Sequence, residues 1–259
     1  MSMSLRALLL SLLCLTVSPA FAGEPFAYKD GDTELEGYFA RTDAPAPAPV
    51  VLIVHQWKGL GEYEKGRADM LAKEGYNAFA IDMYGKGVRP KDLDEAGKFA
   101  GKYKGDSVLA RQRVHAAIAQ IQAMSSVGPQ IAIIGYCFGG TMALEAARAG
   151  EPLAAVVSFH GGLATKAPAE KGAIKEAIQV HHGADDPYVK PEEVASFKEE
   201  MKNAGADMTF YAYPGAVHSF TEKEAGNDNS KGAAYNEAAD KESWARSLAF
   251  LKEAFNKAK

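Results

Sequence analysis

The sequence of 259 residues has only two cysteines, and this scarcity limits how the fold can be stabilised. Cys14 lies in an N-terminal segment that we expect to be removed, so Cys137 would be left as a lone thiol. A lone thiol forms no internal disulfide, and in an oxidising compartment its retention is easier to explain by reactivity than by packing. The histidines and cysteines also show no metal-ligand spacing, so we expect neither a metal nor an organic cofactor.

A large excess of charge of either sign is also absent from the sequence. The chain has 29 lysines and arginines against 33 aspartates and glutamates, a formal net charge of −4 at pH 7. This balance gives no basic field that would attract nucleic acid or an anionic membrane. Beyond the N-terminal segment no apolar run is long enough to cross a bilayer, so we expect no stable membrane insertion after that segment is removed.

The N-terminal segment has the features of a secretory signal. One positive charge in Met1–Arg6 precedes the apolar stretch Ala7–Val17, and Ala20–Ala22 fits the small-x-small cleavage rule. A membrane anchor is the alternative, but the stretch is short for a bilayer span. The sequence therefore predicts a signal peptide over residues 1–22, export to the periplasm, and one domain over residues 23–259.

Along that domain, apolar runs alternate with patterns typical of helices. Strands are expected over 26–29, 35–39, 50–54, 77–81, 131–134, 154–159, 177–181 and 208–213. Helices are expected over 62–74, near 92–100, and over 106–124, 141–147, 191–203 and 233–254. This alternation predicts an α/β fold with a mostly parallel sheet and helices on both faces. In such sheets chemistry is found at the carboxyl ends of the strands.

One such strand end carries the most informative motif. The hexapeptide Gly135–Gly140, with Cys137 at its centre, follows the apolar run Ile131–Ile134 and precedes a helical pattern. The spacing matches the G-x-S-x-G nucleophile elbow with cysteine in place of serine. The alternative is a small buried side chain between glycines that serve only close strand–helix packing.

Two further candidates follow later strands, in the chain order nucleophile, acid and base that is typical of α/β-hydrolase triads. Asp186 comes after the strand at 177–181, and His218 comes after the strand at 208–213. A thiol needs a base to become a thiolate, and His218 could supply it while Asp186 fixes the imidazole tautomer.

Other interpretations of these residue types stay open at this stage. Asp185 and Asp186 could form a turn and cap the helix that begins at Pro191. The alternative bases are His55, His160, His181 and His182.

The three motifs together resemble those of the dienelactone hydrolases (carboxymethylenebutenolidases), a branch of the α/β-hydrolases that uses cysteine as the nucleophile. Gly135–Gly140 matches the elbow of that family, and Asp186, three residues before Val189, matches its Asp-x-x-Val element. The tripeptide His218–Phe220 matches its His-Ser-Phe element. The resemblance covers nearly all of the chain after residue 22.

This resemblance implies a single-domain α/β-hydrolase fold without a large cap domain. It also implies hydrolysis of a small-molecule ester or lactone, with the backbone N–H groups of Trp57 and Phe138 forming the oxyanion hole.

Three positions depart from the family pattern. Gln56 stands where the family has a glutamate that helps to control thiol ionisation; Gln56 cannot take up a proton, although it could still donate a hydrogen bond. Of the two arginines with which the family holds the substrate carboxylate, the first falls at Lys86 and the second at Glu222, which reverses the charge. Arg89 is a further cation that could substitute. Gln56, Lys86 and Arg89 are therefore the candidate substrate contacts.

The departures leave alternatives for the function. A dienelactone hydrolase-like enzyme with a Cys-His-Asp triad is the first. A general carboxylesterase or thioesterase for neutral esters is the second, since the charge reversal at Glu222 should repel an anionic substrate. A non-catalytic binding module that keeps the fold is the third.

Overall fold

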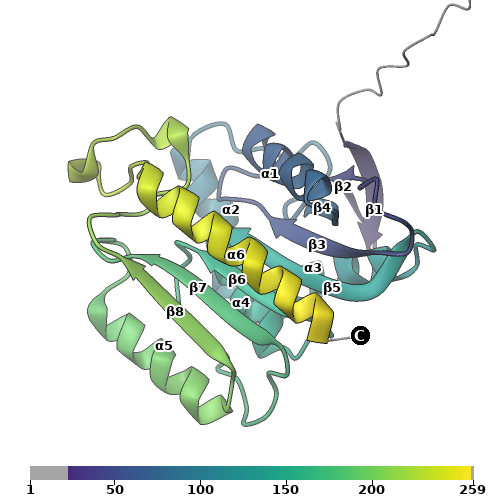
Figure 1. Cartoon of the computed structure of the whole chain (residues 1–259). Helices are drawn as coiled ribbons and strands as arrows, with labels where there is room; N and C mark the ends of the chain where they lie inside the picture. The colour runs from purple at the N-terminus through teal and green to yellow at the C-terminus, as the bar shows by residue number, and fades with distance from the viewer. Residues whose placement is uncertain (1–22, 258–259) are drawn as a thin grey trace, which may run out of the picture.

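The computed structural model describes residues 23–257; the expected signal peptide over residues 1–22, with cleavage after Ala22, lies outside the described residues. Eight strands form one sheet in the order β1-β2-β4-β3-β5-β6-β7-β8 (Figure 1). Strands β3 to β8 are parallel to one another, whereas β1 and β2 form an antiparallel hairpin and β2 pairs antiparallel with β4. The strands are β1 (Glu24–Asp30), β2 (Thr33–Ala40), β3 (Ala48–Val54), β4 (Asn77–Ile81), β5 (Val127–Tyr136), β6 (Ala155–Phe159), β7 (Ala177–Gly183) and β8 (Met208–Tyr213).

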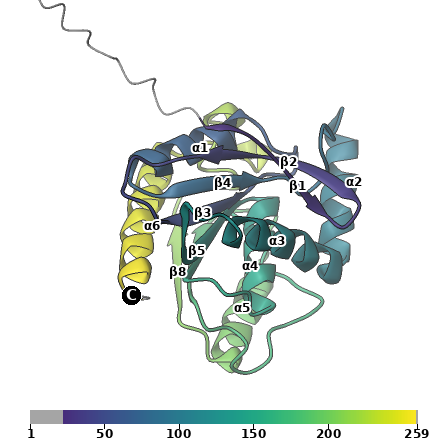
Figure 2. The ribbon, with the colours of Figure 1, turned by 90° about the vertical axis from the view of Figure 1, so that its right-hand side faces the viewer.

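Helices cover both faces of this sheet. Helices α1 and α6 pack on one face and α2, α3, α4 and α5 on the other, as the edge-on view in Figure 2 shows. The helices are α1 (Glu62–Lys73), α2 (Leu93–Gly105), α3 (Ser107–Gln122), α4 (Phe138–Arg148), α5 (Pro191–Ala204) and α6 (Glu237–Lys257), with two short 3-10 turns, η1 (Lys223–Ala225) and η2 (Asn229–Lys231).

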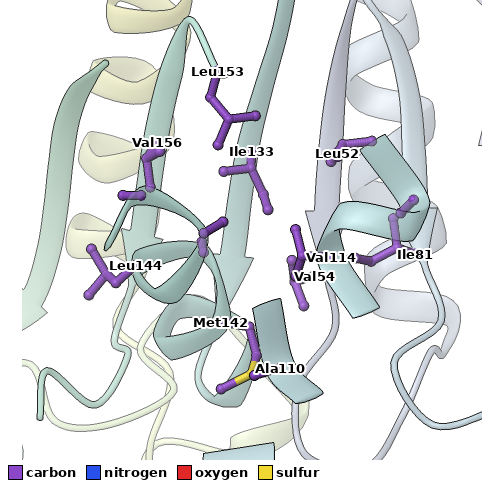
Figure 3. Close-up of a cluster of buried hydrophobic side chains, with 14 of the residues drawn as sticks. Leu52, Val54, Ile81, Ala110, Val114, Ile133, Met142, Leu144, Leu153 and Val156 are labelled. Carbon is purple, nitrogen blue, oxygen red and sulfur yellow. The ribbon is translucent and has the colours of Figure 1, made fainter. Parts of the chain in front are cut away.

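The apolar strands are buried on both faces because alternate side chains point to opposite sides of the sheet. Leu52 and Val54 join the core under α3 and α4, whereas Ile53 joins the core under α1 and α6. Figure 3 shows part of the first core, in which Val114 and Met142 lie near side chains of the central strands. Burial of such continuous apolar runs is the main force that holds the two helical layers on the sheet.

The α/β architecture predicted from the sequence is confirmed, and each expected strand is present. Several boundaries differ, among them those of β5, α2 and α6. Strand β5 is longer than expected, and α2 continues to Gly105. Helix α6 begins at Glu237 and not at Ala233, because residues just before it pair their backbone with the His218 loop: Ala234 N–H donates to His218 O (3.0 Å). Within residues 23–257, none of the helices has the length and apolar character to cross a bilayer.

Candidate active site

A sharp turn between β5 and α4 presents the Cys137 side chain. Cys137 has φ 54° and ψ −116°, a backbone conformation that is costly for a residue with a side chain. The neighbouring glycines are required by space: a Cβ on Gly135 would collide with the carbonyl of Gly139, and one on Gly139 would collide with the carbonyl of Val54. The turn therefore has the geometry of a nucleophile elbow, with the thiol at its apex.

Three side chains from three strand ends form one hydrogen-bonded line at this apex. His218 Nε2 lies 3.0 Å from Cys137 Sγ, and His218 Nδ1 lies 2.8 Å from Asp186 Oδ2. The side chain of Asp186 is fully buried, and its other oxygen accepts the N–H of Tyr188 at 2.8 Å. A carboxylate held in this way fixes the imidazole so that Nε2 faces the sulfur.

The surroundings favour the charged form of both the thiol and the imidazole. Burial alone would raise the pKa of Cys137, but the charges of His218 and Lys104 and the N–H of Phe138 outweigh it, so this pKa is lowered. Burial alone would lower the pKa of His218, but the thiolate and Asp186 outweigh it and raise this pKa. Both shifts therefore favour a thiolate beside an imidazolium.

His160 lies beside the triad but is committed to other partners. Its Nδ1 accepts the backbone N–H of Cys137 at 3.1 Å, so Nε2 carries the proton and donates to Thr221 Oγ1 at 2.8 Å. Burial, the nearby His218 and Arg67 lower its pKa well below the usual value. His160 is thus a neutral support of the elbow and not a base that reaches the sulfur.

A buried hydrogen-bonded chain runs from His160 through Thr221, Tyr63 and Arg67 to Asp240, and we name it the Thr221 chain. The Tyr63 hydroxyl lies 2.7 Å from Thr221 Oγ1, Arg67 Nε donates to the Tyr63 hydroxyl at 3.2 Å, and Arg67 Nη2 donates to Asp240 at 2.6 Å. No local sequence pattern indicates this chain, because its members come from four separate segments and meet only in the fold; Thr221 itself is buried.

Of the other candidate bases, His55 and His181 are occupied, whereas the buried Nδ1 of His182 has no partner within residues 23–257 and makes no described contact with the sulfur. His55 uses both ring nitrogens on backbone groups, Gln56 O at 2.6 Å and Met83 N at 3.2 Å. His181 contacts the Tyr213 hydroxyl at 2.8 Å on the α6 side of the sheet. The described hydrogen bonds of Cys137 Sγ go to His218.

The loop after β3 carries the Trp57 amide and is held by buried groups. Glu64 accepts the N–H of Gln56 at 3.1 Å and of Gly61 at 3.0 Å, and Tyr84 donates to Trp57 O at 2.8 Å. Within residues 23–257 the N–H of Trp57 has no hydrogen-bond partner, which leaves it able to donate to a ligand. The Phe138 amide begins α4 and lies at the thiol.

The candidate substrate contacts lie in different places. Gln56 is buried at the wall of a groove beside the triad. Lys86 Nζ instead pairs with Glu36 at 3.4 Å. Arg89 Nε donates to Leu60 O at 2.9 Å and so ties two loops together. Neither cation lines the groove, although the sequence made both of them candidates.

The groove has a volume of about 910 Å³ and runs between the loop after β3, α1 and the segment after His218. None of the three triad side chains lines it; its wall begins at Trp57 and at Ser219, the residue after His218. Glu222 and Glu224 lie on its wall, and so do the partly exposed apolar side chains of Met70 and Leu93. The groove can hold an apolar part of a ligand. Its lining carries both signs of charge, with Lys58 and Lys223 beside the carboxylates of Glu222 and Glu224.

Comparisons with known proteins identify the family and the fold of the chain. A model of the dienelactone hydrolase family matches residues 35–255. The chain is 34% identical to a dienelactone hydrolase-like promiscuous phosphotriesterase from metagenomic libraries, with a TM-score of 0.84 over 91% of this chain and 99% of that one. It is 27% identical, over 86% of its length and 90% of the relative, to a Bradyrhizobium protein named as a probable 2-oxo-3-(5-oxofuran-2-ylidene)propanoate lactonase. An uncharacterized protein of Caenorhabditis elegans is 36% identical over 151 residues, which are 56% of this chain and 94% of that protein.

Proposed function

Because the chain belongs to the dienelactone hydrolase family, whose members are hydrolases of ester or lactone bonds, we propose that it cleaves such a bond with Cys137 as the nucleophile. His218 is the general base and acid, and Asp186 orients it. The observation that carries the proposal is the position of His218, with one ring nitrogen 3.0 Å from the sulfur and the other 2.8 Å from the carboxylate.

In this mechanism the Cys137 thiolate attacks the substrate carbonyl carbon, and the C=O π electrons move onto oxygen. The N–H groups of Trp57 and Phe138 donate to that oxyanion. The intermediate then collapses, the bond to the leaving oxygen breaks, and the His218 imidazolium protonates the leaving group. Neutral His218 next takes a proton from water, which attacks the thioester, and the released acid leaves the thiolate–imidazolium pair restored.

A second candidate is a general carboxylesterase or thioesterase for neutral substrates. Two observations favour it: Lys86 is paired with Glu36, and Glu222 places a carboxylate on the groove wall. Both weaken the site at which the family pattern would hold a substrate carboxylate. Rates on matched neutral and anionic esters separate the two candidates.

The test is a panel of 4-nitrophenyl esters, lactones and thioesters with the parent protein and Cys137→Ala. We expect the variant to lose activity by about a thousandfold or more, since a triad acts as a unit. We also expect an initial burst of nitrophenol from the parent as the acyl-enzyme accumulates. Full activity in Cys137→Ala would end the cysteine mechanism, and a parent that cleaves no member of the panel would favour the binding module.

We further propose that residues 1–22 are a signal peptide and that residues 23–259 act in the periplasm. The sequence pattern of residues 1–22 supports this. Intact mass of the protein recovered from the periplasmic fraction of an expression host should correspond to a chain that begins at Gly23.

A further inference from the structure

Three side chains from different elements converge on Gly162, in the segment after β6. A Cβ on Gly162 would lie 3.3 Å from Thr141 Oγ1, 3.9 Å from Lys104 Nζ and 4.0 Å from Glu193 Oε1. Gly162 is not among the glycines with positive φ, so its backbone conformation does not explain the missing side chain. The glycine leaves a narrow space, bounded by a hydroxyl, an ammonium and a carboxylate, in which even a methyl group would be tight against Thr141 Oγ1.

The Thr141 hydroxyl is buried without a partner, whereas the exposed Lys104 pairs with no carboxylate within residues 23–257. Thr141 is 5% exposed, yet its hydroxyl makes no hydrogen bond. The salt bridges found within residues 23–257 do not include Lys104. A buried hydroxyl without a partner costs free energy, so its retention in a folded protein calls for a ligand or another reason.

The third group is already satisfied. Glu193 Oε1 accepts the N–H of Leu163 at 2.7 Å and of Ala164 at 3.0 Å, so two backbone donors stabilise its charge. The groups left free at the space are the Thr141 hydroxyl and the Lys104 ammonium, both of which can donate. The ligand atom that accepts from both is an oxygen with negative charge.

This space lies close to the nucleophile. Thr141 is in the first turn of α4, and its backbone N–H donates to Cys137 O at 3.3 Å. Lys104 is one of the charges that stabilise the Cys137 thiolate. Neither residue lines the groove that contains Glu222, so the space is a separate place for a substrate group.

We propose that Lys104 and Thr141 bind a carboxylate of the substrate in the space that Gly162 leaves open. The proposal rests on the proposed function, because the ligand is the substrate that Cys137 attacks. It places the anion-binding cation on α2, whereas the family pattern would place its cations at Lys86 and at the position of Glu222.

The test compares 4-nitrophenyl hemisuccinate, which carries a carboxylate, with neutral 4-nitrophenyl butyrate. The measured quantity is the ratio of their kcat/KM values, in which a general effect on thiol ionisation cancels. We expect Lys104→Gln to lower this ratio about tenfold or more, the usual effect of losing a hydrogen bond to a charged group. Lys102→Gln is the matched control, because Lys102 is also in the last turn of α2, and its ratio should stay at the parent value.

Two further variants test the other members of the site without changing charge. Thr141→Val should lower the ratio while the melting temperature holds or rises, because the lost hydroxyl has no partner in the free protein. Gly162→Ala should lower the ratio by filling the space. A ratio that is unchanged in Lys104→Gln, or that falls equally in Lys102→Gln, overturns the proposal.

A second readout separates this proposal from the proposed hydrolysis. The rate of Cys137 alkylation by iodoacetate, relative to neutral iodoacetamide, reports a cation at the thiol without any turnover. We expect this relative rate to fall in Lys104→Gln and to hold in Lys102→Gln. If the parent cleaves neither ester nor any other member of the panel, the proposed function fails, and an unchanged alkylation ratio in Lys104→Gln then also rejects the anion site.

Discussion

Two polar regions flank the Cys137 elbow, and they differ in how their hydrogen bonds are satisfied. In the Thr221 chain, from His160 through Tyr63 and Arg67 to Asp240, each side chain has a partner. At Gly162, the buried Thr141 hydroxyl has no partner within residues 23–257, and the exposed Lys104 ammonium forms no salt bridge there. A satisfied network holds a structure in place, whereas unsatisfied groups beside a nucleophile are available to a ligand.

The Thr221 chain also shows how the elbow is supported. His160, at one end of the chain, accepts the backbone N–H of Cys137. The other end is the ion pair of Arg67 and Asp240, whose side chains are 8% and 14% exposed. The Tyr136 hydroxyl nearby is an exception to the pairing, since it is buried without a partner. The guanidinium of Arg67 lies over the Tyr136 ring, 5.6 Å from its centroid.

The largest effect is expected from a change in the triad that lies between the two regions. Asp186→Asn should lower kcat/KM by about a thousandfold, because the amide favours the wrong imidazole tautomer and cannot stabilise the imidazolium. Steady-state rates on a cleaved ester measure this loss. Asp185→Asn is the control, since Asp185 accepts the Gly215 N–H and does not touch His218. Equal losses in both variants would contradict the role given to Asp186.

The next effect tests the structural role of the Thr221 chain. Arg67→Met should lower the free energy of unfolding by about 3 kcal/mol, because it leaves the partly buried Asp240 carboxylate unpaired. Denaturant unfolding measures it. Arg246→Met removes an exposed arginine from a pair of the same 2.6 Å length and should cost less. A stable Arg67→Met protein with altered substrate preference would reverse the distinction between the two regions.

The pH dependence of kcat/KM should report the pKa values of Cys137 and His218. The pKa of Cys137 is lowered from 9.0, so the thiolate persists to lower pH than that of a free thiol and is lost as pH falls through the lowered value. The pKa of His218 is raised from 6.5 to about 10, so the imidazolium persists until pH rises through that range. The kcat/KM profile should therefore have a plateau between the two pKa values.

Thiolate absorbance in the ultraviolet gives a direct check on the same pair. Its titration midpoint should lie below 9.0 in the parent and move upward in His218→Gln, which removes the main group that opposes the effect of burial. A midpoint that is the same in both proteins would mean that His218 does not stabilise the thiolate.

The smallest effect is expected from Lys104 on a neutral ester. Lys104→Gln removes one of several charges that stabilise the thiolate, so kcat/KM for 4-nitrophenyl butyrate at neutral pH should fall by no more than about threefold. The rate should recover as pH rises, because higher pH restores the thiolate. A loss that persists at high pH would indicate a structural defect.

The fold and the three residues of the triad line could be predicted from the sequence because each depends on local signals. The alternation of apolar runs and helical patterns fixed the layers, and Cys137, Asp186 and His218 each follow a core strand. Parallel strands bring their carboxyl ends to one edge of the sheet, so positions distant in sequence meet there.

The remaining parts depend on packing that no local pattern reveals. Lys104 and Thr141 meet because α2 and α4 lie beside the segment that contains Gly162. The charges of Lys86 and Arg89 made them candidates. In the fold, however, the long Lys86 side chain pairs with Glu36, and Arg89 donates to the carbonyl of Leu60. Sequence alone identifies charge and does not say where a flexible side chain ends.

The pairing of the His218 loop with the segment before α6 has a practical consequence for remodelling this protein. His218 N–H donates to Gly232 O at 3.2 Å, and Asn236 N–H donates to Phe220 O at 3.0 Å. A loop exchange intended to reshape the groove can replace residues 223–231 but has to retain residues 232–236, because their backbone hydrogen bonds hold the His218 loop in position. Grafts that extend into residues 232–236 should leave a folded protein in which the His218 imidazole no longer lies within hydrogen-bond distance of the Cys137 sulfur.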